Sequence, residues 1–95
     1  MLMSVVNWGE VYYVLIKEYG VEKAKQIISL IDTLPVDIAP ANRETTQQAA
    51  FYKAQKKLAY ADSFAAALSK LQKAVLFTAD KEFESVEKEI KISWV

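Results

Sequence analysis

The stretch Val75-Leu76-Phe77-Thr78-Ala79-Asp80 (VLFTAD, residues 75–80) decides the fold, because a short strand-forming run leads directly into a residue that can begin a helix. We predict a buried strand over residues 75–78 and a short polar helix from Asp80 to about residue 88. Alternating apolar side chains then predict a final strand over residues 90–94. The C-terminal part of the chain is therefore expected to run strand, helix, strand.

The N-terminal part repeats this order. Residues 2–6 are mostly apolar or β-branched, which predicts a strand, and Asn7 is expected to cap a helix over residues 8–19. That helix carries apolar side chains on all its faces, so we expect it to be largely buried. Gly20 is expected to end it.

The middle of the chain continues the alternation. We expect a helix over residues 21–34, a short strand over residues 36–39, a polar helix capped by Asn42, and a further helix after a turn at residues 60–62. Strands that alternate with helices form crossover connections and parallel sheets. We therefore predict a single α/β domain over residues 1–95, with a parallel sheet and helices on both faces.

The composition narrows the chemistry. The chain has no histidine and no cysteine, so imidazole and thiolate groups cannot serve as nucleophiles, proton shuttles or metal ligands. Twelve basic and twelve acidic side chains cancel, which excludes a global positive field for nucleic acid. With only two glycines, neither a dinucleotide fingerprint nor a phosphate-binding P-loop can be present. The absence of cysteine fits a cytoplasmic protein, and an apolar share of 53% favours self-association.

Three carboxylates, Glu10, Asp62 and Asp80, each stand where a helix is expected to begin. In a parallel α/β fold the helices begin at the edge where the strands end, so the three should share one rim, where such sheets bind ligands. Acidic residues at helix starts also serve simply as caps. If the three converge, their mutual repulsion requires a cation, and Mg²⁺ or Mn²⁺ is the hard ion that oxygen ligands select.

Three stretches carry a resemblance to a known family. They are, in chain order, residues 4–13 (SVVNWGEVYY), 60–68 (YADSFAAAL) and 76–83 (LFTADKEF). They resemble the PIN-domain family, and specifically the virulence-associated protein C (VapC) type toxins. The resemblance implies a Mg²⁺- or Mn²⁺-dependent endoribonuclease that acts on RNA, is usually a homodimer and is inhibited by an antitoxin protein.

Carried over to this sequence, the resemblance makes Glu10, Asp62 and Asp80 three of the family's four metal-site acids. Thr78 matches the hydroxyl residue that often precedes the last acid, and we expect it to support the ligands without touching the ion. Family members begin with a strand that carries the first catalytic Asp, followed by a helix. The resemblance thus implies a PIN-like domain truncated at its N-terminus, with another chain as one possible source of the missing strand.

Two further expectations complete the prediction. Lys53, Lys56 and Lys57 lie at helical spacing and could contact RNA phosphates, although such clusters are more often solvated faces. The function is expected to be water attack on an RNA phosphodiester, assisted by carboxylate-bound metal. The alternative is a catalytically inactive PIN-like fragment that binds an antitoxin or associates with itself.

Overall fold

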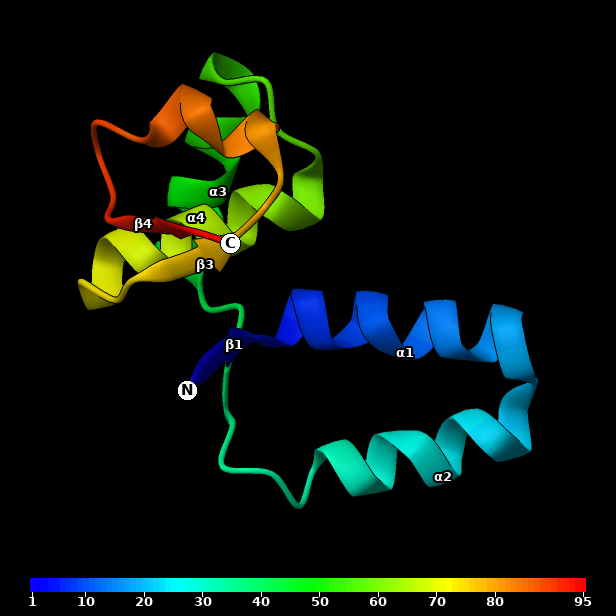
Figure 1. The fold of residues 1–95 in the computed structure, drawn as a ribbon. Coiled ribbons are helices and arrows are strands. Elements are labelled where there is room, and N and C mark those ends of the chain that lie inside the picture. Colours follow the sequence, from blue (N-terminus) through cyan, green and yellow to red (C-terminus); the bar gives the residue numbers. More distant parts are fainter.

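A computed structural model describes all residues from 1 to 95 and contains four short strands, four α-helices and one 3₁₀ helix (Figure 1). In chain order they are β1 (Leu2–Ser4), α1 (Val5–Tyr19), α2 (Val21–Ile31), β2 (Asp37–Ala39), α3 (Arg43–Gln55), α4 (Tyr60–Gln72), β3 (Leu76–Thr78), η1 (Lys81–Val86) and β4 (Ile92–Trp94). This order confirms the predicted α/β class.

The strands pair in parallel, as predicted, but they form two separate two-stranded sheets and not the single sheet that was expected. In the first, β1 pairs with β2 and Met3 lies opposite Ile38. In the second, β3 pairs with β4 and Phe77 lies opposite Ser93. Helix α4 contacts both β1 and β3 and so connects the two sheets.

The hydrophobic core lies in the part of the chain that follows β2. Helices α3 and α4 pack closely against each other, and η1 adds its apolar side chains to theirs. Phe64 of α4 is 3% exposed and packs edge-to-face on Tyr60, with ring centroids 5.1 Å apart. The buried cluster consists of Ala49, Tyr52, Leu58, Phe64, Ala66, Ala67, Phe83, Val86 and Ile90.

The prediction that the first helix is buried is wrong. No residue of α1 is buried, because α2 is the only element that packs along the length of α1. The two helices form a hairpin that projects from the rest of the molecule (Figure 1). The hairpin raises the total exposed area to 6476 Å². A compact monomer of 10.7 kDa exposes about 5,500 Å², so this shape leaves a surplus of apolar surface in water.

Two other local predictions are also wrong. The helix α1 begins at Val5, and its cap is Ser4, whose Oγ accepts a hydrogen bond from the backbone N–H of Val6 at 3.1 Å. Asn7 is therefore inside the helix. The strand β3 was expected to be buried, yet Phe77 is 64% exposed.

Candidate functional site

The candidate site lies where β3 ends and η1 begins. Asp80 caps η1, since its Oδ1 accepts a hydrogen bond from the backbone N–H of Glu82 at 2.9 Å. The Oγ1 of Thr78 accepts a hydrogen bond from the backbone N–H of Asp80 at 3.0 Å. The sequence Thr78-Ala79-Asp80-Lys81-Glu82 thus forms two consecutive side-chain-to-backbone turns, which hold both carboxylates at the end of the strand.

The third carboxylate comes from α4. Asp62 lies in the first turn of that helix, as predicted, and is half-buried. One carboxylate oxygen from each of Asp62, Asp80 and Glu82 lies within 4.8 Å of the other two. We call these three residues the acidic cluster. The structure therefore brings together two of the three acids that the sequence singled out, and it adds Glu82.

Glu10 takes a different position from the one predicted. It lies well inside α1 and is exposed, because the helix begins at Val5, and it is not part of the acidic cluster. It is nevertheless near Asp62, since its charge helps to raise the pKa of Asp62. The start of α1 is held against α4 by a hydrogen bond from the Nδ2 of Asn7 to the backbone carbonyl of Ala61 at 3.0 Å.

The electrostatics of the acidic cluster favour a bound cation. Burial raises the pKa of Asp62 above its usual value of 3.8, and the charges of Asp80, Glu10 and Glu82 raise it further. A carboxylate in that position is destabilised when ionised, and either a proton or a cation relieves the strain. Oxygen-only ligands of this kind suit Mg²⁺ or Mn²⁺, so the donor set fits the predicted metal.

The three lysines of the predicted RNA surface have different environments. Lys53 donates a hydrogen bond to the backbone carbonyl of Leu58 at 3.0 Å, and Lys56 forms an ion pair with Glu89 at 3.1 Å. Lys57 is exposed and forms no ion pair or side-chain hydrogen bond. All three line a surface pocket of about 380 Å³ that Glu82 also borders. The pocket therefore connects the lysines to the acidic cluster.

Glu82 is the residue that the sequence reasoning missed. Its backbone N–H donates a hydrogen bond to the Oδ1 of Asp80, and its own carboxylate lies within 4.8 Å of those of Asp62 and Asp80. The spacing Asp80-Lys81-Glu82 is the signal that could have found it, since a capping Asp commonly brings the residue two positions later into its own turn.

The family model of the PIN domain matches residues 1–89 of the chain. No curated protein matches the chain closely enough to add a named relative. No helix of the structure is both long and apolar enough to cross a membrane.

Proposed function

Because the chain belongs to the PIN-domain family, whose fold is of the nuclease type, we propose that it is a metal-dependent endoribonuclease of the VapC toxin kind. The observation that carries this proposal is the acidic cluster: three carboxylates from two elements, one of them half-buried with a raised pKa, gathered at the end of a parallel strand. Parallel α/β folds bind their ligands at this edge.

In the proposed mechanism, Asp62, Asp80 and Glu82 would hold Mg²⁺ or Mn²⁺, and Glu10 adds negative charge beside them. When bound there, the ion would activate water as a Lewis acid and would neutralise charge on the scissile phosphodiester. Thr78 positions Asp80 through its hydrogen bond to the backbone N–H of that residue. No side chain of the site forms a covalent intermediate, since the nucleophile is water.

The pocket beside the acidic cluster provides a place for the RNA backbone. Lys57 has an uncommitted ammonium group and is the best candidate for a phosphate contact, while the Lys53 and Lys56 ammonium groups are held by Leu58 and Glu89. The substitution Lys57→Ala should weaken binding evenly across RNA sequences and reduce the salt slope by about 1. Lys23→Ala, on the distant helix α2, is the matched control.

Mg²⁺-dependent cleavage of single-stranded RNA tests the proposed activity. Asp80→Asn should abolish cleavage while the chain remains folded, because asparagine caps a helix as well as aspartate does. Glu84→Gln should leave cleavage intact, since Glu84 belongs to the same 3₁₀ helix but not to the acidic cluster. Equal loss of activity in both variants, or cleavage that survives in chelator, would refute the assignment.

The exposed hairpin supports two proposed protein partners, which are a second copy of the chain in a homodimer and an antitoxin. We propose that both associations take place in the cytoplasm. Large apolar side chains cover much of α1 and α2, and those that are exposed include Val5, Tyr13, Val14, Ile16, Tyr19, Val21 and Leu30. Light scattering at micromolar concentration should give twice the mass of one chain. A folded chain that associates but does not cleave RNA would favour the alternative, an inactive interaction module.

A further inference from the structure

A pocket that the proposed mechanism does not use lies at the opposite end of α4 from the acidic cluster. Its volume is about 350 Å³, and three lysines line it, Lys70 and Lys73 at the end of α4 and Lys91 just before β4. Asp62 lies in the first turn of the same helix. At about 1.5 Å per helical residue, Asp62 and Lys73 are about 16 Å apart along the helix axis. We call this the distal pocket.

The distal pocket carries an excess of positive charge. None of its three lysines forms an ion pair. Its one acidic residue is Glu89, whose carboxylate already forms an ion pair with Lys56 at 3.1 Å. Lys70 donates instead to the backbone carbonyl of Glu89 at 3.4 Å, which holds its ammonium group at the pocket without cancelling its charge. Lysines at the end of a helix also complement its dipole, but that role does not account for Lys91, which belongs to another segment.

The backbone at Lys73 supports a role for its side chain. Lys73 ends α4 with φ 53° and ψ 38°, and it is the only residue other than glycine that has a positive φ. Glycine adopts this left-handed conformation at lower cost and is the residue most common at helix ends of this kind. The turn itself therefore does not require lysine, and the residue adds a positive charge at the distal pocket.

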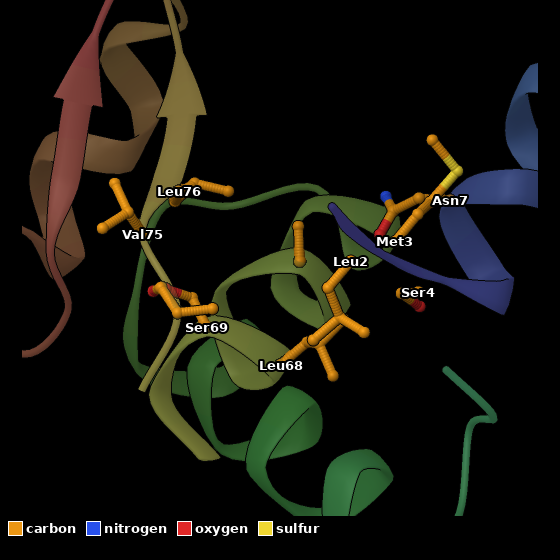
Figure 2. Close-up of a pocket in the computed structure, with 10 residues that line it drawn as sticks. Leu2, Met3, Ser4, Asn7, Leu68, Ser69, Val75 and Leu76 are labelled. Atoms are coloured by element: carbon orange, nitrogen blue, oxygen red, sulfur yellow. The ribbon is translucent and has the colours of Figure 1, made fainter. Parts of the chain in front are cut away.

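The same turn also borders an apolar hollow. Ser69 and Ala74 line both the distal pocket and this hollow, in which seven of the ten lining residues are hydrophobic. Figure 2 shows the hollow, with Ser69 at the end of α4 and with Val75 and Leu76 where the chain enters β3. A phosphate group binds where charged donors are available. Of these two cavities, the distal pocket is therefore the one that suits a phosphate.

Two contacts join the distal pocket to the acidic cluster. Glu89 lines the distal pocket, and its partner Lys56 lines the pocket that Lys53 and Lys57 also line. Glu82 of the acidic cluster borders that same pocket. A nucleic acid strand bound at the acidic cluster can therefore follow one continuous run of lysines to the distal pocket. The separation of about 16 Å corresponds to about five nucleotides of a stacked strand, at about 3.4 Å each.

We propose that the distal pocket is a phosphate-binding subsite for single-stranded RNA, about five nucleotides away from the scissile bond. Its assignment to RNA rests on the proposed function. RNA is favoured over an acidic polypeptide because the run of lysines ends at the acidic cluster, where a bound cation suits a phosphodiester. Lysine binds phosphate as a compact point charge and does not read bases, so the subsite adds affinity for longer RNA without sequence preference.

Fluorescence anisotropy with a labelled, single-stranded RNA decamer in chelator tests the subsite without cleavage. The variant combines Lys73→Gly, which suits the left-handed turn, with Lys91→Ala, at an exposed side chain. Each phosphate contact to a single strand contributes about 0.7 to the salt slope, so the slope should fall by about 1.4 and the affinity at about 0.1 M salt by more than about tenfold. Lys91→Ala alone should lower the slope by about 0.7, which keeps the test available if the double variant does not fold.

Lys88→Ala is the matched control, because Lys88 is exposed in the same segment as Lys91 but does not line the distal pocket. It should leave the slope unchanged. The proposal would be overturned by an unchanged slope in Lys91→Ala, or by an equal decrease in Lys88→Ala. It is also wrong if a ten-residue polyglutamate binds as tightly as the RNA and the double variant loses both ligands equally, because the pocket would then recognise an acidic polypeptide.

A cleavage assay separates this proposal from the proposed function. With Mg²⁺ present, the double variant should raise the KM for the decamer more than it lowers kcat, because the subsite contributes binding at a distance from the reacting phosphate. If the unaltered chain cleaves RNA and the double variant keeps its KM and its salt slope, the subsite is refuted and the nuclease remains. If the unaltered chain never cleaves but the variants lower the salt slope as expected, the nuclease is refuted and the subsite remains.

Discussion

Neutralising Asp62 should stabilise the metal-free protein and remove its response to metal. The oxygens of the acidic cluster lie within 4.8 Å of one another, and at that distance two unit charges repel by about 0.9 kcal/mol in water and about 3.5 kcal/mol at a dielectric of 20. Asp80 and Glu82 are exposed, so we take the lower value. Asp62→Asn removes two of the three repulsive pairs, which gives about 1–2 kcal/mol after screening by salt.

This gain is measurable by thermal unfolding in chelator. A change of 1 kcal/mol shifts the melting temperature of a domain of this size by about 4–8 °C. In the unaltered chain, Mg²⁺ or Mn²⁺ at one hundred times its dissociation constant should stabilise by about 2.7 kcal/mol, and Asp62→Asn should lose most of that effect. Glu18→Gln is the control, because Glu18 is exposed in the last turn of α1 and belongs to no cluster.

The effect of Asp62→Asn depends on pH in a defined direction. The pKa of Asp62 is raised in the folded protein, so the folded state binds the proton more tightly than the unfolded state does. The stabilising contribution of this proton is complete below the unfolded value of about 3.8 and is lost as the pH rises through the raised pKa. The advantage of Asp62→Asn should therefore be largest at neutral pH and disappear below about pH 4. The reasoning would be refuted if, at pH 7, the metal-free unaltered chain were as stable as the variant and its stability did not respond to added metal.

Three further predictions concern the fold. Gly20 has φ 85° and ψ 166°, a conformation that is open almost only to glycine, so Gly20→Ala should lower the free energy of unfolding in urea by about 1–3 kcal/mol. Gly9 lies within α1 in open space, so Gly9→Ala should raise the free energy of unfolding by up to about 1 kcal/mol. Phe64→Ala should cost about 3–5 kcal/mol in the same assay, because it empties a buried site in a small core; a cost below 1 kcal/mol would contradict the core described above. Asn42→Ala should lower the free energy of unfolding by about 1 kcal/mol, since the Oδ1 of Asn42 accepts a hydrogen bond from the backbone N–H of Thr45 at 2.9 Å. An unchanged urea midpoint would show that this cap is not formed in solution.

The sequence predicts those features that depend on a few neighbouring residues. Gly20 ends α1, Asn42 caps α3 and Asp80 caps η1, as expected, because each uses its own backbone or side chain within three positions. The cap of α1 shows where local reasoning fails. Ser4 and Asn7 both have capping side chains, and the amide of Asn7 is instead committed to Ala61, 54 residues further along the chain.

Tertiary contacts decide the remaining differences. The apolar residues around α1 predicted a buried helix, but burial depends on which partner covers it, and within the chain only α2 packs along its length. Glu82 was missed for a related reason: it belongs to the acidic cluster because Asp62 of α4, twenty residues earlier in the chain, lies within 4.8 Å of it. Periodicity in a sequence shows which side chains are apolar or acidic, but it does not show which residues they contact in the folded protein.

The division of the molecule into two sheets also bears on the candidate site. Asp62, Asp80 and Glu82 belong to α4 and to the segment that follows β3, whereas Glu10 lies on the helix that follows β1. The hydrogen bond between Asn7 and Ala61 joins these two parts near the site. The acidic cluster therefore depends on the well-packed part of the molecule, and the contribution of Glu10 depends on how firmly the two sheets are held together.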